Sequence, residues 1–224
     1  FRSQGRRMAI RVFLADDHTV VRDGLRILLE AQGDIEVVGD ASDGRQAVAL
    51  ASQLQPDVVV MDIAMPGLNG IDAAQEIRRA CPSVEILILS MHSTNEHIFR
   101  ALNAGARGFL LKESAGAEVV QAVRSVTAGQ RYFSEKITDA ASMDRDYLLR
   151  QAALKSPIER LSPRERQILQ LVVEGKTSAE IAEMLYLSPK SIETYRSRLM
   201  QKIGVSDLPA LIKFAIQHGL TTLG

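Results

Sequence analysis

The sequence predicts a doubly wound parallel α/β sheet of five strands, followed by a small all-α domain of four helices. Between residues 8 and 133, short β-branched or apolar runs alternate five times with segments of helical periodicity. Such alternation is typical of a parallel sheet with helices on both faces. Residues 158–224 show helical periodicity throughout. We therefore expect two domains of different class, joined by a linker over residues 134–157.

Composition separates the two parts and argues against a membrane protein. Charged side chains make up 24% of the 224 residues, and no apolar run approaches the roughly 18 residues of a spanning helix. The single Cys81 excludes an internal disulfide and fits a reducing cytoplasm. Residues 8–133 hold 11 Lys and Arg against 16 Asp and Glu, whereas residues 157–224 hold 9 against 7. This asymmetry indicates different partners for the two parts, and no membrane partner is expected.

The elements of the first part can be placed from periodicity. The expected strands are the apolar runs 10–14, 35–41, 58–61, 85–89 and 108–111. The expected helices are the segments of helical spacing 18–30, 43–54, 71–80, 94–104 and 115–128. Right-handed crossovers between parallel strands would distribute these helices over both faces of the sheet.

Polar side chains follow four of the five runs at the points where the strands end. They are Asp16 and Asp17 after the first run, Asp62 after the third, Ser90 after the fourth and Lys112 after the fifth. The carboxyl ends of parallel strands meet at one edge of such a sheet, so these groups should converge. Converging carboxylates repel one another unless a hard cation such as Mg²⁺, which prefers oxygen ligands, lies between them. A hydroxyl and an ammonium suit a tetrahedral anion, and a carboxylate can attack phosphorus to form an aspartyl phosphate.

Taken singly, these residues have simpler explanations. Asp16 or Asp17 can cap the following helix, Asp62 can cap the following turn, and Lys112 can be a solvated surface charge. Their combination at successive strand ends favours the functional interpretation. The histidines show no metal-ligand spacing and are expected to be ordinary loop or surface residues: His18, His92 and His97.

The five strand-end residues closely resemble the receiver domain of bacterial two-component response regulators, which has a flavodoxin-like fold. The resemblance covers about residues 9–133. It implies that Asp62 accepts a phosphoryl group from a sensor histidine kinase. It also implies a Mg²⁺ site whose ligands are Asp16, Asp17, Asp62 and the backbone carbonyl of Ala64.

The same resemblance implies roles for three residues on the later strands. Lys112 would pair with the phosphoryl oxygens, and Ser90 would move toward the phosphate after transfer. Phe109 would turn inward with Ser90 as an aromatic switch. Many receivers carry Pro after the Lys, whereas Glu113 follows here. This departure resembles the subclass whose output domain binds DNA through four helices.

Capping signals place the helices of the second part. The preceding linker mixes charged, Ala and Ser residues with a few leucines, and it contains one candidate helix over 144–154. Two capping boxes, Ser162–Glu165 and Thr177–Glu180, begin the first two helices. After a two-residue turn, a third helix begins at Ser188–Pro189 and runs to about Ile203. Helix, tight turn and helix is the arrangement whose second helix enters the DNA major groove.

The third helix has one apolar and one polar side when read at about 100° per residue. The polar side is free to meet base edges through Lys190, Glu193, Thr194, Ser197 and Gln201. Basic residues beside this strip would meet phosphates: Arg196, Arg198 and Lys202. For an isolated helix, a solvated face of a helix bundle is the alternative. Three capped helices with a tight turn favour the interpretation as a DNA-binding face.

Residues 161–220 also resemble the LuxR-type helix-turn-helix domain. The matching landmarks are Leu161–Arg166, Glu174–Lys176, Glu180–Ala182, Leu187–Ser188, Lys202–Val205 and a final helix over 208–218. Together with the receiver, they resemble the NarL/FixJ class of response regulators. In that class the final helix commonly forms the dimer contact on DNA. The resemblance therefore implies a homodimer, with candidate contacts at Leu208, Leu211, Ile212 and Ala215.

The combined resemblance implies a cytoplasmic transcription factor controlled by phosphorylation of Asp62. It would bind promoter DNA and would be no enzyme beyond slow self-phosphorylation and dephosphorylation. A small α/β phosphatase or nucleotide-binding enzyme is an alternative from another class. It would need a Gly-rich phosphate loop after the first strand, where residues 15–18 read Ala-Asp-Asp-His. A third hypothesis is a regulator that binds DNA without being phosphorylated.

Overall fold

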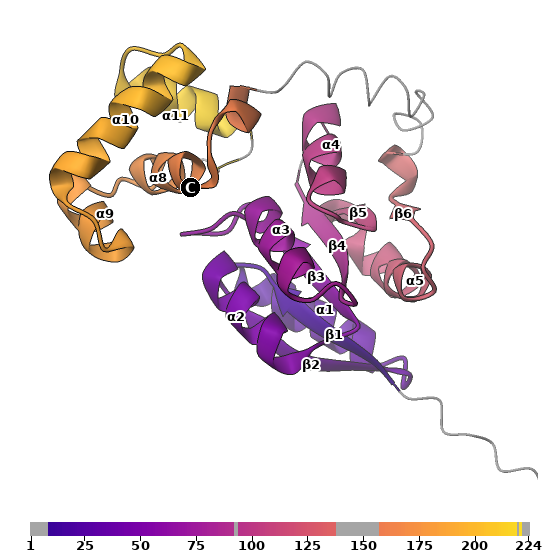
Figure 1. Ribbon diagram of the computed structural model, residues 1–224. Coiled ribbons are helices and arrows are strands. Elements are labelled where there is room, and N and C mark those ends of the chain that lie inside the picture. Colours follow the sequence, from indigo (N-terminus) through magenta and orange to yellow (C-terminus); the bar gives the residue numbers. More distant parts are fainter. Residues whose placement is uncertain (1–8, 92–93, 138–156, 219, 221–224) are drawn as a thin grey trace, which may run out of the picture.

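The computed structural model describes residues 9–91, 94–137, 157–218 and 220. These residues form an α/β unit followed by an all-α unit (Figure 1). The predicted fold class is thereby confirmed. Within the described ranges, no helix is both long and apolar enough to cross a membrane.

The α/β unit contains a parallel sheet with the strand order β2-β1-β3-β4-β5-β6. Its strands are β1 (Ile10–Ala15), β2 (Ile35–Ala41), β3 (Val58–Asp62), β4 (Glu85–Ser90), β5 (Gly108–Leu111) and β6 (Tyr132–Phe133). Strands β1 to β5 coincide with the apolar runs of the sequence, because such runs suit strands buried on both faces. The predicted count of five strands is wrong by one.

The additional strand, β6, lies beside β5 at the edge of the sheet. Gly108 and Phe109 of β5 lie opposite Tyr132 and Phe133 in parallel register. A two-residue strand is too short to show alternation or an apolar run, so the sequence pattern does not reveal it.

The chain continues to pack against the sheet after β6. The Ser134 hydroxyl accepts a hydrogen bond of 3.1 Å from the Leu111 N–H. Ile137 is fully buried in the same apolar cluster as Phe109. The α/β unit therefore extends past the expected boundary at Phe133 to at least Ile137. The helix expected over 144–154 lies outside the described residues.

Five α-helices cover the two faces of the sheet. They are α1 (Thr19–Glu30), α2 (Gly44–Leu54), α3 (Gly70–Ala80), α4 (Asn95–Asn103) and α5 (Ala115–Thr127), which the short 3-10 helix η1 (Lys112–Ser114) precedes. Alternate residues of β1 point to opposite faces. Val12 and Leu14 pack in a cluster with α1 and α5, whereas Phe13 and Ala15 pack with α2, α3 and α4. The sheet thus has an apolar layer on each side.

The all-α unit has four α-helices around one apolar core. They are α8 (Pro163–Val173), α9 (Ser178–Leu185), α10 (Pro189–Ile203) and α11 (Leu208–Gln217), after the 3-10 helix η2 (Pro157–Arg160). Both expected capping boxes are present, at Ser162 with Glu165 and at Thr177 with Glu180. The core includes Ile168, Leu171, Ile181, Ile192, Leu199 and Leu211.

Candidate functional site

Three of the strand-end residues meet at the carboxyl edge of the sheet. The Lys112 Nζ lies 2.8 Å from the Asp16 Oδ2 and 2.8 Å from the Asp62 Oδ2. The side chains of Asp16 and Asp62 are each 2% exposed, and that of Lys112 is 9% exposed. Strands β1, β3 and β5 bring together these residues, which are far apart in the sequence. The ammonium thus bridges two buried carboxylates.

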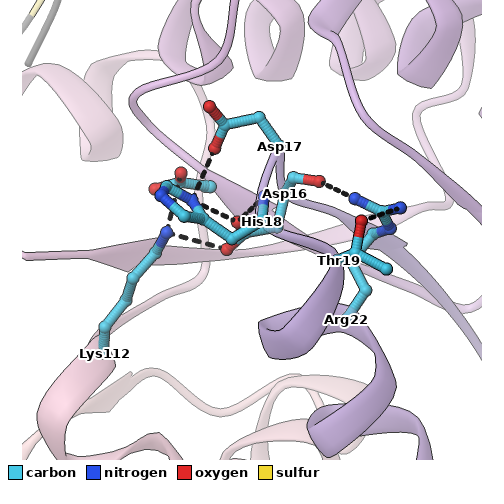
Figure 2. A network of polar contacts seen from close by, with 7 residues as sticks. Asp16, Asp17, His18, Thr19, Arg22 and Lys112 are labelled. Carbon is cyan, nitrogen blue, oxygen red and sulfur yellow. Dashed lines mark hydrogen bonds and ion pairs between the residues drawn. The ribbon is translucent and has the colours of Figure 1, made fainter. Parts of the chain in front are cut away.

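Asp17 and His18 lie beside Asp16 and Asp62 and form with them a cluster of potential metal ligands. Asp16, Asp17, His18 and Asp62 each offer one ligand atom, and these atoms lie within 4.8 Å of one another. The His18 Nδ1 lies 3.1 Å from the Asp16 Oδ1 and 2.7 Å from the Asp17 Oδ1 (Figure 2). The carboxylate oxygens fit Mg²⁺, which prefers hard oxygen donors.

The expectation for the histidines is wrong at His97, which is 3% exposed in α4 rather than on the surface. His18 lies in the loop before α1 with its side chain 63% exposed, as expected, although its ring also lies beside the acidic cluster. His92 lies outside the described residues. The only sequence signal for His18 was its position next to Asp16 and Asp17.

Asp62 is a buried carboxyl group whose titration is strongly perturbed. Burial raises its pKa from 3.8 to about 6, nearby Asp16 adds to the increase, and the positive charge of Lys112 opposes it. For Lys112, burial lowers the pKa, but the carboxylates of Asp62 and Asp16 outweigh burial and the pKa is raised. The site therefore contains more negative charge than one ammonium neutralises. A divalent cation beside Asp62 would favour the ionised carboxylate.

The loop after β3 turns back closely against Asp62. The Ala64 N–H donates a hydrogen bond to the Asp62 carboxylate. The Gly70 N–H, at the start of α3, donates to the Ile63 carbonyl at 2.9 Å. A Cβ at Gly70 would lie only 1.8 Å from the Asp62 carbonyl oxygen. Glycine is therefore required for this turn, which keeps Ala64 beside the carboxylate.

Ser90 and Phe109 lie on the two strands between Asp62 and β6. Ser90 ends β4 and is 3% exposed. Phe109 in β5 is fully buried and packs in the same cluster as Ile98 and Ile137. The ring thus already has an inward position in this structure.

Helix α8 contacts the loop that follows Asp62. The Gln170 Nε2 donates to the Met65 carbonyl at 2.7 Å, and the Gln170 Oε1 accepts from the Asn69 N–H at 2.8 Å. The Glu174 Oε1 accepts from the Gly67 N–H at 2.9 Å. Gln170 is 1% exposed. A glutamine flanked by Leu in an amphipathic helix gives no sequence signal for such a contact.

Further polar contacts link the two units. The Arg166 Nε lies 3.1 Å from the Asp72 Oδ1 in α3. The Arg100 Nη1 in α4 donates to the His218 carbonyl at 2.8 Å, and the His218 Nδ1 lies 2.6 Å from the Glu96 Oε1. The all-α unit is therefore held against α3, α4 and the β3–α3 loop.

Helix α10 presents the polar strip that the sequence predicts. Its exposed members are Lys190, Glu193, Thr194, Ser197, Arg198, Gln201 and Lys202, whereas Arg196 is half-buried. On the opposite side, Ile192 and Leu199 are fully buried. Because the contacts to the α/β unit come from α8 and from His218, this strip stays accessible to solvent while the units are in contact.

Several residues of α10 also have structural partners. Arg196 Nη1 donates to the Ser178 hydroxyl at 2.9 Å, and that hydroxyl also bonds Glu193. The Lys202 Nζ lies 2.7 Å from the Glu165 Oε2 of the first capping box. Arg196 and Lys202 therefore help to hold α10 against its neighbours.

The dimerisation candidates in α11 separate into two groups. Leu208 is 43% exposed and Ile212 is half-buried. Leu211 and Ala215 are at most 1% exposed and belong to the domain core. Their expected surface role is therefore wrong, because spacing alone did not tell which side of α11 packs inward.

Both units match known families. Residues 12–124 match the response regulator receiver domain, and residues 159–215 match the bacterial regulatory proteins of the luxR family. The chain is 38% identical over 216 residues to the transcriptional regulatory protein MctR of Rhizobium johnstonii, covering 96% of this chain and 97% of MctR. It is 40% identical over 211 residues to the response regulator UvrY of Escherichia coli, covering 94% and 95% of the two chains.

A solved structure is similar to this chain over both units. The structure described as a complex of the two-component response regulator RcsB with DNA is similar over 94% of this chain and 98% of that chain. The identity is 28% and the TM-score is 0.57. These similarities span both units and keep their order. The chain therefore belongs to the NarL/LuxR family of response regulators, which join a receiver domain to a LuxR-type DNA-binding domain.

Proposed function

We propose that Asp62 is the phosphoacceptor of this response regulator and that its phosphorylation controls DNA binding by α10. The observation that supports the phosphoacceptor most directly is the buried contact of Lys112 with Asp62 and Asp16 at the carboxyl edge of the sheet. The proposed donor is a sensor histidine kinase. The proposed setting is the cytoplasm, where the kinase's phosphohistidine and the promoter DNA are both accessible.

In the proposed transfer, an Asp62 carboxylate oxygen attacks the phosphorus of a phosphohistidine. The new P–O bond forms as the P–N bond breaks, and the electron pair of that bond stays on the imidazole nitrogen. Lys112 would neutralise charge on the phosphoryl oxygens. Asp16, Asp17, Asp62 and the Ala64 carbonyl would hold Mg²⁺, which when bound supplies further positive charge to the transferring group. The product is an aspartyl phosphate, with no turnover of a diffusible substrate.

The contact of α8 with the β3–α3 loop supports a route from Asp62 to the DNA-binding domain. Met65, Gly67 and Asn69 accept or donate the bonds to α8 and lie within seven residues of Asp62. A phosphoryl group on Asp62 would alter the loop and favour an open form, in which α10 and α11 can engage DNA as a homodimer through Leu208 and Ile212. The proposed domains are a receiver of residues 8–133, against which the chain packs as far as Ile137, a linker of residues 134–157, and a DNA-binding domain of residues 158–224.

Labelling with acetyl phosphate and Mg²⁺ tests the phosphoacceptor. Wild-type protein should approach one phosphoryl group per chain, and Asp62→Asn should take up none. Asp23→Asn, which changes an exposed aspartate of α1, is the matched control and should label normally. Stoichiometric labelling of the Asp62→Asn protein would reject the assignment. DNA affinity measured with and without phosphodonor then tests the coupling, since equal affinities would support phosphorylation-independent binding.

A further inference from the structure

Arg22 connects helix α1 to the peptide that carries the acidic pair. The Arg22 Nη1 donates to the Asp16 carbonyl oxygen at 2.6 Å, and the Nη2 lies 3.4 Å from the Thr19 hydroxyl (Figure 2). The Arg22 Nε donates to the Asp40 Oδ2 at 3.0 Å. The Arg22 side chain is only 14% exposed. One guanidinium thus joins the end of β1 to the edge strand β2.

The contact fixes a backbone unit that has few other constraints. The Asp16 N–H donates to the Ala41 carbonyl at 3.1 Å, which holds one end of the residue to β2. The Asp16 carbonyl lies beyond the last register pair of β1, Ala15 with Ala41, so it needs a partner outside the sheet. Arg22 supplies that partner. The peptide between Asp16 and Asp17 is thereby held in one orientation.

That orientation determines where the two carboxylates point. Asp16 directs its carboxylate inward to Lys112 and Asp62, whereas Asp17 is exposed at the mouth of the site. A rotation of the peptide between them would separate their oxygens. A planar guanidinium suits this role because its donors have fixed directions, unlike the single ammonium of lysine.

Asp40 holds a second arginine, which provides a natural control. The Arg26 Nη2 donates to the Asp40 Oδ1 at 2.7 Å, and the Arg26 Nη1 lies 3.8 Å from the Glu30 Oε1. Arg26 thus shares the carboxylate with Arg22, one turn further along α1, but its contacts are to Asp40, Glu30 and the Val37 carbonyl. Substitution of Arg26 should disturb the same ion pair without releasing Asp16.

We propose that Arg22 is a positioning residue of the phosphoacceptor site, which preorganises the Asp16–Asp17 peptide for divalent-cation binding. The proposal rests on the proposed function of the acidic cluster as a Mg²⁺ site. No contact between Arg22 and the phosphoryl group is implied. Its effect would be exerted through the orientation of the two aspartates.

Calorimetric titration of the full-length protein with Mg²⁺, without phosphodonor, tests the proposal. Arg22→Met should weaken Mg²⁺ binding at least tenfold, and Arg22→Lys should give an intermediate loss. Arg26→Met should stay within twofold of wild type. An Arg22→Met protein that is folded and binds Mg²⁺ within twofold of wild type would overturn the proposal, as would an equal loss in Arg26→Met.

A second measurement separates positioning from general stability. The rate of labelling by acetyl phosphate, followed against Mg²⁺ concentration, should show a tenfold higher half-saturating Mg²⁺ for Arg22→Met, with a maximal rate near that of wild type. A purely structural role would lower the melting temperatures of Arg22→Met and Arg26→Met alike and leave the half-saturating Mg²⁺ concentration unchanged.

If Arg22→Met does not fold, Asp40→Asn replaces it. Asp40→Asn should raise the half-saturating Mg²⁺ concentration about threefold, whereas no increase would contradict the proposal. Failure of wild-type protein to label would instead reject the phosphoacceptor, and the calorimetric comparison would still report on Arg22.

Discussion

The Gln170 amide of α8 donates a 2.7 Å hydrogen bond to the backbone carbonyl of Met65, three residues after Asp62. The same amide group accepts from the Asn69 N–H. One side chain of the DNA-binding domain thus spans the turn that carries the proposed carbonyl ligand Ala64. Any change in that turn, whether from a phosphoryl group or from a cation, must be accommodated by Gln170.

Gln170→Ala should favour the open form of the protein. The substitution removes three buried hydrogen bonds between the units, and the two short ones are worth about 1 kcal/mol each. DNA affinity of the unphosphorylated protein should therefore rise by up to about thirtyfold, as measured by fluorescence anisotropy. Because the turn beside Asp62 would no longer be tied to α8, labelling by acetyl phosphate should also become faster.

Gln121→Ala provides the control for Gln170. Gln121 is an exposed residue of α5 on the α/β unit. Its replacement should change neither DNA affinity nor the labelling rate by more than about 1.5-fold, in keeping with the small effects of most surface substitutions. Equal affinities for Gln170→Ala and wild type would show that the α8 contact does not restrain DNA binding.

Asp62→Asn should stabilise the fold more at pH 8 than at pH 4. Burial raises the pKa of Asp62 from 3.8 to about 6, although Lys112 opposes the increase. The folded state then binds the proton more tightly than the unfolded state. The linked stability is fully present below pH 3.8 and is lost as pH rises through 6. This shift of the Asp62 pKa corresponds to a change of about 3 kcal/mol at most in the free energy of unfolding.

Urea unfolding at the two pH values measures this difference as a free energy of unfolding. The exposed-site variant Asp23→Asn should change the free energy of unfolding by less than about 0.5 kcal/mol at both pH values. Mg²⁺ at pH 8 should stabilise wild-type protein more than Asp62→Asn, since the cation offsets the buried negative charge. An equal gain for Asp62→Asn at pH 4 and pH 8 would contradict the perturbed ionisation of Asp62.

The parts of this site that the sequence predicts are those fixed by topology. Asp16, Asp62 and Lys112 end parallel strands, and parallel topology alone brings such ends together. The contacts of Arg22 and Gln170 are made to the backbone carbonyls of Asp16 and Met65, and a carbonyl partner leaves no pattern in the sequence. The sequence did not predict the two-residue strand β6 either. The position of β6 depends on the free edge of β5 rather than on a pattern in its own residues.

Gly70→Ala and Gly24→Ala should have opposite effects on stability. A Cβ at Gly70 would meet the Asp62 carbonyl oxygen at 1.8 Å, so the β3–α3 turn must shift. We expect a loss of about 3 kcal/mol, at the upper end of overpacking effects. Gly24 lies within α1, and a Cβ there would project into open space, with no neighbouring side chain within 4 Å. Alanine at Gly24 should add about 0.5–1 kcal/mol through its higher helix propensity.

Thermal unfolding of the two glycine variants, followed by circular dichroism, gives the comparison. Gly70→Ala should also slow labelling by acetyl phosphate, because the turn beside the Asp62 carboxylate is displaced. Gly24→Ala should label at the wild-type rate. A Gly70→Ala protein with unchanged stability would mean that the turn can move away from Asp62 at little cost.

Arg198 and Lys202 both lie on α10, but we expect Arg198 to contribute to DNA binding and Lys202 to contribute to the stability of the domain. Arg198 is exposed in α10, beside the residues of the polar strip that we expect to meet base edges. Arg198→Ala should weaken DNA binding by a similar factor on all sequences and reduce the slope of log affinity against log salt by about 0.9, the value for one phosphate contact. The melting temperature should stay unchanged.

Lys202 has a structural partner in α8. Burial raises the pKa of Glu165, but the hydrogen bonds from Lys202 and Ser162 outweigh burial and hold the pKa below its ordinary value. Lys202→Ala should therefore lower the free energy of unfolding, by about 1 kcal/mol, because a buried carboxylate loses a charged partner. Anisotropy titrations at several salt concentrations, with urea unfolding of the same proteins, separate the two roles. If Lys202→Ala reduced the salt slope as Arg198→Ala does and left stability unchanged, Lys202 would be a phosphate contact released from Glu165 on DNA.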